Sequence, residues 1–175
     1  MNRFLTPALI FALLVAVLWV AVLRAPEKSV IQSVLIGKPA PSFALAELNR
    51  PQNIVDSKGL LGHWYAFNVW GTWCVECRAE HDALLTIKRD ARVPLIGMDW
   101  KDEDAAATQW LQELGNPYDR VLVDHDGRVA IDWGVYGAPE TFLVNPQGTI
   151  VYKHVGAMNE DVWQKQFMAR VGAGR

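Results

Sequence analysis

The chain begins with an unbroken apolar stretch and then changes to short alternating patterns of hydrophobic and polar residues. Phe4–Leu23 contains 18 apolar residues out of 20 and no charged side chain. Beyond it, runs of β-forming residues alternate with stretches in which apolar residues recur every three or four positions, as on a helix with one buried face. This order predicts an α/β domain behind an apolar N-terminal helix.

A strand, a helix and a second strand are predicted in the first half of the domain. Residues 64–70 form a near-continuous run of β-formers, which is typical of a strand covered on both faces. Residues 75–90 place apolar side chains along one helical side. Residues 93–98 form a short strand in which Pro94 is tolerable only near the start. This succession favours parallel strands joined by a right-handed crossover.

Two more helices and a third strand are expected further on. One helix should begin with Asp102 as its N-cap and end at Gly115, before a strand at 121–123. The last helix should begin at the N-cap Asn159, with four residues facing inward: Val162, Trp163, Phe167 and Val171.

A β-hairpin is predicted between these helices. Strands at 141–144 and 149–152 flank Asn145-Pro146-Gln147-Gly148, whose Pro and Gly positions suit a type I turn. Pro139 stands immediately before the first of these strands. Because an X-Pro bond prefers trans by only about 0.5–1 kcal/mol, a tight turn could hold Pro139 in cis, and an ordinary trans proline is the alternative.

The run Phe4–Leu23 is long enough to cross a bilayer, because twenty helical residues rise about 30 Å. A cleaved signal peptide is the alternative, but Arg24 and Pro26 crowd the place where a small-x-small cleavage site would stand. We therefore expect residues 1–24 to be a membrane anchor. The positive charges on its two sides nearly balance, so charge alone does not set its orientation.

The rest of the sequence divides into a linker, residues 25–36, and a mildly acidic domain, residues 37–175. From Gly37 onward 14 Lys and Arg stand against 18 Asp and Glu, and the whole chain has a formal net charge of −2. This balance argues against a nucleic-acid binder, which would show a basic patch. Two cysteines cannot build a disulfide framework, and they supply at most half of a tetrahedral zinc site.

The candidate chemistry lies in Trp73-Cys74-Val75-Glu76-Cys77, between a predicted strand and a predicted helix. Cys74 opens that helix, where free backbone N–H groups and the positive end of the helix dipole stabilise a thiolate. Cys74 should therefore have a lowered pKa and act as the nucleophile. One helical turn brings the sulfur of Cys77 within bonding reach, so the pair can cycle between dithiol and disulfide.

Four other uses of two cysteines fit the sequence less well. A c-type haem site needs His after the second cysteine, where Arg78 stands, and a zinc site would have His81 but no evident fourth ligand. A purely structural disulfide would close a very small loop and stabilise little. A peroxidatic cysteine would follow Pro and Thr at positions that Phe67 and Gly71 occupy. A redox-active pair is the favoured hypothesis.

Four longer strings are more specific than the cysteine motif: Gly37-Lys38-Pro39-Ala40-Pro41-x-Phe43, Asn68-Val69-Trp70-Gly71-Thr72-Trp73-Cys74, Cys77-Arg78-Ala79-Glu80-His81 and Gly134-Val135-Tyr136-Gly137-Ala138-Pro139-Glu140-Thr141. Trp-Cys-x-x-Cys after a strand and Gly-Ala-Pro before a later one resemble the thioredoxin fold. The longer strings resemble the CcmG/DsbE group, membrane-anchored thiol:disulfide interchange proteins of cytochrome c maturation. This resemblance covers essentially the whole chain.

The resemblance implies an α/β thioredoxin-like fold, with a central mixed sheet flanked by helices and an N-terminal transmembrane helix. Pro139 would be a cis-proline that faces the cysteine pair, and the backbone at Ala138 would pair with an extended substrate strand. Glu80 and Glu140 match acidic positions near the active site, and Trp73 matches an exposed aromatic residue beside the nucleophile. For Glu80, a solvated helix face is the alternative.

The resemblance also implies partners and a location. The domain would lie in the periplasm, on a single-pass anchor in the bacterial inner membrane with its N-terminus inside. Its substrate would be apocytochrome c, reduced in the Cys-x-x-Cys-His segment, or another disulfide-bearing protein, and a DsbD/CcdA-type membrane thiol reductant would supply electrons. No metal and no cofactor are implied beyond the redox-active disulfide Cys74–Cys77.

One departure from the family pattern concerns the motif itself. Family members commonly carry Pro directly after the first cysteine, whereas this chain has Val75, which is less well pre-organised for a helix start. Negative charge from Glu76, Glu80 and Glu140 should oppose the Cys74 thiolate. A generic membrane-tethered disulfide reductase and a thiol-based metal chaperone are the alternative functions.

Overall fold

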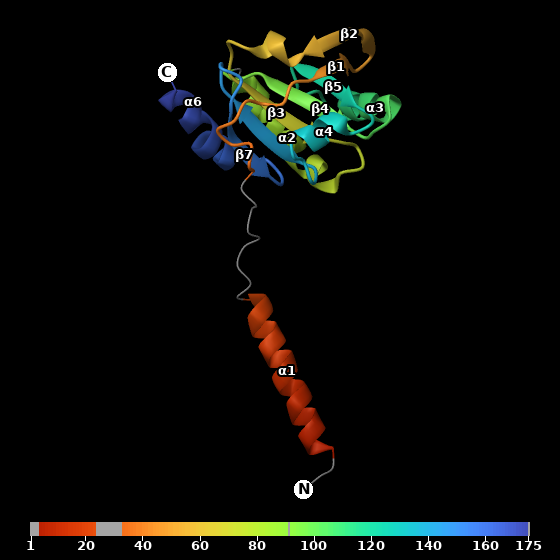
Figure 1. The fold of residues 1–175 in the computed structure, drawn as a ribbon. Helices are drawn as coiled ribbons and strands as arrows, with labels where there is room; N and C mark the ends of the chain where they lie inside the picture. Colours follow the sequence, from red (N-terminus) through yellow and green to blue (C-terminus); the bar gives the residue numbers. More distant parts are fainter. Residues whose placement is uncertain (1–3, 24–32, 91, 175) are drawn as a thin grey trace. The chain divides into compact units, whose positions relative to one another are not determined.

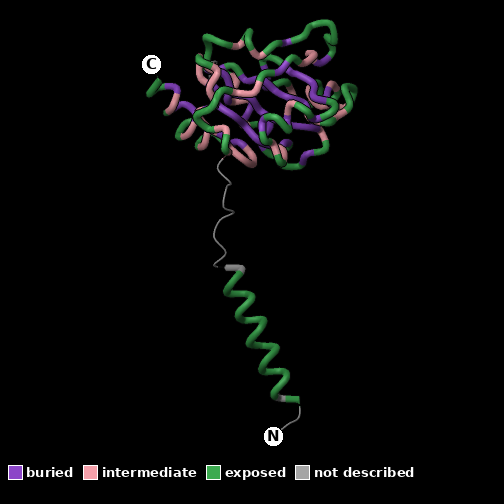
Figure 2. The backbone as a smooth tube through the Cα atoms, viewed as in Figure 1, coloured by how far each residue is buried: buried purple, intermediate pink, exposed green. Residues whose placement is uncertain are grey.

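The computed structural model describes residues 4–23, 33–90 and 92–174, which form two compact units. The first contains helix α1, Leu5–Leu23, whose described side chains are exposed (Figures 1 and 2). Among the described residues, no helix combines the length and the apolar character of a membrane-crossing segment. Residues 1–3 and 24 of the expected anchor, and 25–32 of the expected linker, lie outside the described residues.

The second unit is built on one seven-stranded mixed sheet with the order β2-β1-β5-β4-β3-β6-β7. The central strands β3, β4 and β5 are parallel, and the other pairs are antiparallel. The strands are β1 Ala44–Glu47, β2 Arg50–Asp56, β3 Tyr65–Trp70, β4 Leu95–Trp100, β5 Arg120–Asp124, β6 Glu140–Val144 and β7 Ile150–Val155.

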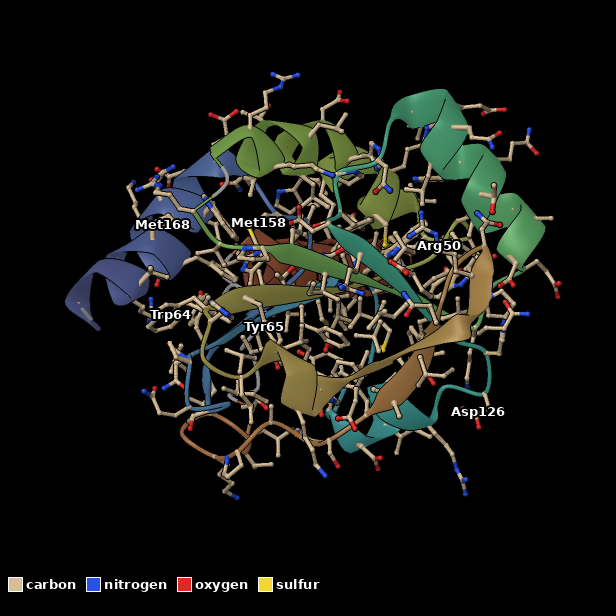
Figure 3. The ribbon with its side chains drawn as sticks, turned by 90° about the horizontal axis from the view of Figure 1, so that it is seen from above. Arg50, Trp64, Tyr65, Asp126, Met158 and Met168 are labelled. Atoms are coloured by element: carbon tan, nitrogen blue, oxygen red, sulfur yellow. A yellow bond between two sulfur atoms is a disulfide. The ribbon has the colours of Figure 1, made fainter. Side chains whose placement is uncertain are left out.

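Helices cover both faces of this sheet (Figure 3). They are η1 Ser57–Leu60, α2 Val75–Asp90, α3 Asp104–Leu114, α4 Arg128–Asp132, α5 Glu160–Val162, the π-helical turn η2 Trp163–Met168 and α6 Ala169–Ala173. One core lies under α2, α3 and the C-terminal helices and contains both cysteines, with Trp70, Leu84 and Phe167; we call it the cysteine-side core. The core on the other face contains Phe43, Phe67, Trp133 and Phe142; we call it the opposite core.

The parallel unit β3-α2-β4 confirms the strand–helix–strand prediction, with Trp70 of β3 opposite Asp99 of β4. Helix α2 has the predicted bounds. Strand β4 begins at Leu95 rather than at residue 93, because Pro94 has no N–H to donate; only its carbonyl joins the ladder, accepting from the N–H of Ala66 at 2.9 Å.

The prediction that Asp102 caps the next helix is wrong. Helix α3 begins at Asp104, and its N-cap Glu103 makes no side-chain cap hydrogen bond. The carboxylate of Asp102 instead accepts hydrogen bonds from the backbone N–H and the hydroxyl of Thr72, far away in sequence. A tertiary contact has therefore displaced a local capping preference.

The hairpin and the last helix are confirmed. Strands β6 and β7 are antiparallel, and Gly148 N–H donates to the carbonyl of Asn145 at the turn. The Asn159 side chain accepts from the N–H of Val162 at 2.9 Å, as an N-cap does. Of the four expected inward residues, three are buried and Val162 is half-buried.

The sequence did not reveal the edge hairpin β1–β2 or the short helix α4. Strand β2 is almost wholly exposed and contains Pro51 and Asn53, both depleted in strands, so no apolar alternation marks it. Helix α4 has five residues, too few to show a helical period. Leu35, expected in the linker, packs against the opposite core, so the end of that segment belongs to the folded unit.

Candidate active site

The two cysteines lie at the junction of β3 and α2, as predicted. Cys74 immediately precedes α2, and Cys77 lies in its first turn. Their sulfurs form a disulfide, and their Cα atoms are 5.2 Å apart. Both are nearly inaccessible, at 5% and 3% exposure, so exposure alone does not distinguish the attacking sulfur.

The helix start does distinguish them. The backbone N–H of Cys77 points at Cys74 Sγ, with a separation of 3.0 Å. In the reduced form this donor and the positive end of the α2 dipole favour a thiolate on Cys74 over one on Cys77. The geometry therefore supports Cys74 as the nucleophile and Cys77 as the sulfur that closes the ring.

Trp73 lies beside the nucleophile and is 51% exposed, which agrees with the aromatic position implied by the family. Its indole N–H donates to the carbonyl of Trp100 at 3.1 Å, and the two rings meet edge to face at 5.5 Å. Gly71 permits this arrangement, because a Cβ there would lie 2.5 Å from the Trp73 indole nitrogen. The turn before Cys74 is thus fixed by close packing.

Glu80 is buried at 1% exposure, so the alternative of a solvated helix face is wrong for it. Its carboxylate accepts from Asn68 Nδ2 at 3.0 Å and from the N–H of Met158 at 2.6 Å. Burial raises the pKa of Glu80 to about 7, although both hydrogen bonds oppose the shift. Glu76, in contrast, is exposed.

Asn68 connects Glu80 to the rest of this face. Its Nδ2 also donates to Thr141 Oγ1 at 3.0 Å, and its Oδ1 accepts from the Tyr118 hydroxyl at 2.8 Å. The network joins β3, α2, β6 and the segment before β5 inside the cysteine-side core. Its members are buried, so the network lies within the protein rather than in solvent.

The Ala138–Pro139 peptide bond is cis, which is the first of the two isomers considered from the sequence. Ala138 packs against the cysteine-side core, the core that contains both sulfurs. The structure therefore brings the segment before β6 and the cysteine pair to the same core.

Glu140 follows directly but faces the opposite core, on the side of Phe142, because side chains alternate along β6. Its carboxylate pairs with Lys153 Nζ at 2.8 Å and accepts from the N–H of Tyr136 at 3.2 Å. Lys153 also donates to the carbonyl of Gly134 at 2.9 Å. Burial raises the pKa of Glu140, and the Lys153 ammonium opposes that rise. Because Lys153 binds the carbonyl of Gly134 and Glu140 binds the N–H of Tyr136, the ion pair holds the segment that contains Pro139.

Four buried polar residues of this region were not identified from the sequence: Asn68, Asp99, Tyr118 and Lys153. The available signal was a polar residue inside an otherwise apolar strand, as in Tyr65–Trp70 and Leu95–Trp100. Such a residue requires buried partners, and so marks a position to which other elements bring polar groups.

His81, the third ligand in the metal alternative, has both ring nitrogens engaged. Trp110 Nε1 donates to Nδ1 at 3.3 Å, so Nε2 carries the proton and donates to the carbonyl of Gly115 at 2.9 Å. The ring would have to break two hydrogen bonds to join the cysteines at a metal. This arrangement disfavours the chaperone alternative.

A mixed sheet flanked by helices, a Cys-x-x-Cys pair at a helix start and a cis-proline before an antiparallel strand define a thioredoxin-fold thiol:disulfide oxidoreductase. The family model described as Redoxin matches residues 35–168. The thiol:disulfide interchange protein DsbE of Yersinia pestis is 42% identical over 166 residues, 93% of this chain and 88% of that protein. DsbE of Allochromatium vinosum is 42% identical over 99% of this chain and 97% of its own length. The chain belongs to the DsbE family.

Solved structures agree on the fold. A protein described as thiol:disulfide interchange protein DsbE from Chlorobium tepidum superposes with a TM-score of 0.67 and 22% identity, over 81% of this chain and 98% of that one. DsbF of MTB gives a TM-score of 0.66 and 22% identity, over 73% and 93%.

Proposed function

We propose that this thiol:disulfide oxidoreductase reduces the disulfide of the Cys-x-x-Cys-His segment of apocytochrome c, so that haem can be attached there. The observation that carries the proposal is Cys74 Sγ at the start of α2, with the Cys77 N–H directed at it, in a chain of the DsbE family. We expect the half-exposed Trp73 to supply a surface for an extended client, and the backbone at Ala138 to pair with that client, as the family resemblance implies.

Reduction proceeds in two exchanges. The Cys74 thiolate attacks one sulfur of the client disulfide; that S–S bond breaks, a mixed disulfide forms, and the released client thiolate takes up a proton. The Cys77 thiolate then attacks Cys74 Sγ, the mixed disulfide breaks, and the second client thiolate leaves and is protonated. Two electrons and two protons pass to the client, and the Cys74–Cys77 disulfide remains.

The proposed setting is the periplasmic side of a bacterial inner membrane. The apolar run Phe4–Leu23 would anchor the chain there with its N-terminus inside, and a DsbD/CcdA-type membrane thiol reductant would restore the dithiol. This part is tested by carbonate extraction: the full chain should stay in the membrane fraction, and a chain without residues 1–24 should not.

The attack order is tested with Cys77→Ser and Cys74→Ser variants of the full chain. The reduced Cys77→Ser protein, mixed with an oxidised Cys-x-x-Cys-His peptide, should accumulate a thiol-sensitive adduct at Cys74, visible by mass spectrometry. Cys74→Ser should form none. Adducts in Cys74→Ser, or none in Cys77→Ser, would contradict the order.

The client class is tested with two peptides that differ only in the haem-binding histidine. A haem-site reductase should reduce the His-containing peptide faster than its Ala counterpart, and cells that lack the gene should lose cytochrome c unless a small thiol is added. Equal rates on both peptides, with normal cytochrome c content, would favour the generic reductase.

A further inference from the structure

The connection from β4 to α3 makes two contacts with the turn that leads into the nucleophile. Asp102 accepts hydrogen bonds from the Thr72 backbone N–H and, at 2.9 Å, from the Thr72 hydroxyl. The carbonyl of Trp100 accepts from the indole N–H of Trp73 at 3.1 Å. We call residues 100–102 the support segment. Thr72 and Trp73 are therefore both held from outside their own strand and helix.

The carboxylate of Asp102 is half-buried and has donors on both of its oxygens. Its Oδ2 accepts from the Thr72 N–H, and its Oδ1 accepts from the Thr72 hydroxyl and from the N–H of Glu103 at 2.8 Å. Within the turn, the Cys74 N–H donates to the carbonyl of Gly71 at 3.1 Å. Because hydrogen bonds to an ionised acceptor are stronger than neutral ones, this carboxylate restrains the turn more firmly than an amide or a hydroxyl would.

The support segment itself has an uncommon backbone conformation. Lys101 has a φ of 52°, in the left-handed region that is unfavourable for a residue with a side chain. Its N–H donates to the carbonyl of Asp124 at 3.1 Å. Gly127 also packs closely here, since a Cβ on it would collide with Lys101 Cε and lie 2.9 Å from Trp100 Nε1. Such a position persists only where the surrounding structure imposes it, and positions of this kind cluster at functional sites.

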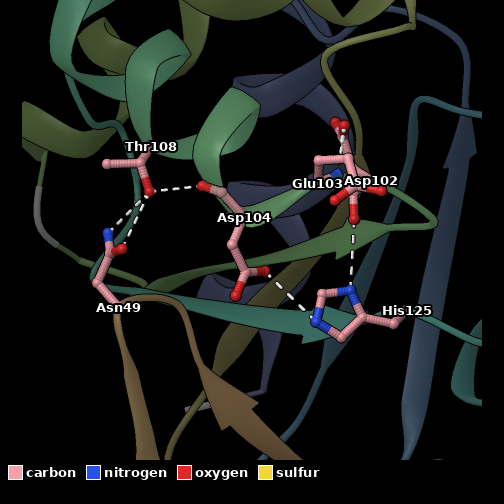
Figure 4. A network of polar contacts seen from close by, with 6 residues as sticks. All are labelled: Asn49, Asp102, Glu103, Asp104, Thr108 and His125. Carbon is pink, nitrogen blue, oxygen red and sulfur yellow. Dashed lines mark hydrogen bonds and ion pairs between the residues drawn. The ribbon is translucent and has the colours of Figure 1, made fainter.

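The far end of the connection is tied to α3 and to the turn between β1 and β2 (Figure 4). His125 Nδ1 lies 3.3 Å from the backbone oxygen of Asp102, and His125 Nε2 lies 3.4 Å from Asp104 Oδ1. The Thr108 hydroxyl donates to the carbonyl of Asp104 at 2.6 Å, and Asn49 Nδ2 donates to Thr108 at 2.9 Å. Asp102 belongs to this network and also reaches the active-site turn, so it joins the two.

We propose that Asp102 is a positioning residue for the first exchange, and that through Thr72 it sets the direction from which Cys74 Sγ attacks the client disulfide. The thiolate has to approach in line with the S–S bond that breaks, and a misplacement of about 1 Å can slow a reaction by about 10²-fold. Asp102 acts through Thr72 and not on the reacting sulfurs. The inference rests on the proposed role of Cys74 as the nucleophile.

A positioning role and a purely electrostatic role of Asp102 predict opposite results. If Asp102 acted only through its negative charge, which opposes a thiolate on Cys74, its removal would raise the thiolate fraction and speed exchange at neutral pH. If Asp102 positions the turn, its removal slows exchange even though the thiolate fraction does not fall. The direction of the change in rate therefore separates the two roles.

The test uses the reduced full chain with Cys77→Ser, in which the first exchange stops at the mixed disulfide. Mass spectrometry follows adduct formation over a range of concentrations of an oxidised Cys-x-x-Cys-His peptide. Asp102→Ala should lower the saturating rate by about tenfold and change the half-saturating concentration much less, because attack and not the first contact is misdirected. The plateau rate of alkylation by iodoacetamide, a small reagent that approaches from many directions, should stay within about twofold of the parent.

Thr72 and Glu103 supply matched variants. Thr72→Val replaces the hydroxyl by a methyl group and should lower the saturating rate by about threefold, whereas Thr72→Ser keeps a hydroxyl and should restore it. Adding Thr72→Val to Asp102→Ala should change little more, because the hydroxyl has then already lost its carboxylate. Glu103→Gln removes a negative charge from the same connection, where its side chain makes no cap hydrogen bond, and should keep the parent rate.

Equal saturating rates in the parent, Asp102→Ala and Thr72→Val, or a faster rate in Asp102→Ala, would overturn the positioning role and leave the attack order intact. Failure of the parent Cys77→Ser chain to form any adduct would overturn both. If Asp102→Ala does not fold, the Thr72 variants decide alone, and Thr72→Val reacting as fast as Thr72→Ser would contradict the proposal.

Discussion

The two faces of the sheet bury charge in opposite ways. On the side of the opposite core, Glu140 has a cation 2.8 Å away, and Lys153 also lies over the Phe142 ring with Nζ 5.1 Å from its centroid. On the cysteine side, no cation among the described residues pairs with the buried carboxyls of Glu80 and Asp99: the pKa of Glu80 is lowered only by hydrogen bonds, and every influence on Asp99 raises its pKa.

The ion pair of Glu140 and Lys153 has a structural role, whereas buried carboxyls without a cation are suited to taking up and releasing protons. A compensated pair keeps its charges over a wide pH range and holds a segment in place, as Lys153 and Glu140 hold the segment before β6. Uncompensated carboxyls ionise near neutrality instead, and such groups cluster at sites where protons move. The cysteine pair lies on the same face of the sheet as the uncompensated carboxyls of Glu80 and Asp99.

Stability should change most when the ion pair between Lys153 and Glu140 is broken. Lys153→Met leaves a buried carboxylate without its cation and should lower the free energy of unfolding by about 3–5 kcal/mol. Urea denaturation of the full chain measures it. Lys165→Met is the control, because its pair with Asp161 is exposed and should contribute at most about 0.5 kcal/mol. Equal losses in both variants would remove the contrast between the faces.

The free energy of unfolding should depend on pH through Glu80, the buried carboxyl of α2. Burial raises the pKa of Glu80 from 4.5 to about 7, so its contribution to stability is fully present below pH 4.5 and is lost as the pH rises through about 7. Glu80→Gln should lack this loss, worth about 3 kcal/mol between those limits.

Denaturation at pH 4.5 and pH 8 measures this difference. Asp82→Asn, which removes an exposed carboxyl from the same helix, is the control. If the stability of Glu80→Gln depends on pH as that of the wild type does, Glu80 is not a buried carboxyl with a raised pKa.

The packing that supports the polar network can be tested at Gly97. A Cβ there would lie 2.7–2.8 Å from three atoms of the Tyr118 ring, whose hydroxyl reaches Asn68. Gly97→Ala should therefore destabilise the domain by about 1–3 kcal/mol through overpacking. Gly59→Ala, where a Cβ meets no atom of the described residues within 4 Å, should be much milder, and a similar loss at both glycines would argue against the close approach.

A weaker loss of stability is expected at the start of the C-terminal helix that covers the cysteine-side core. Asn159 caps it, next to Met158, whose N–H binds Glu80. Asn159→Ala should cost about 1 kcal/mol, and Asn159→Ser should restore most of it, because Ser also caps well. Thermal unfolding of the two variants measures the difference, and equal melting temperatures would show that the cap contributes nothing.

The sequence revealed what local pattern determines. Helix α2, the parallel unit and the hairpin follow from apolar periodicity and turn chemistry, and the cysteine pair follows from its position at a helix start. The polar network was hidden, because three of its four hydrogen bonds join residues that are 50 to 78 positions apart and the fourth joins residues 12 positions apart. The same reason explains the error at Asp102, whose partner Thr72 is 30 positions away.

The most direct test is the order in which the two thiols ionise in the reduced chain, followed by the ultraviolet absorbance of the thiolate. We expect the first transition to belong to Cys74 and to lie below the value of about 8.5 for a free cysteine. Replacing Cys74 by serine should therefore abolish it. If the early transition survives in Cys74→Ser and disappears in Cys77→Ser, the nucleophile has been assigned to the wrong sulfur.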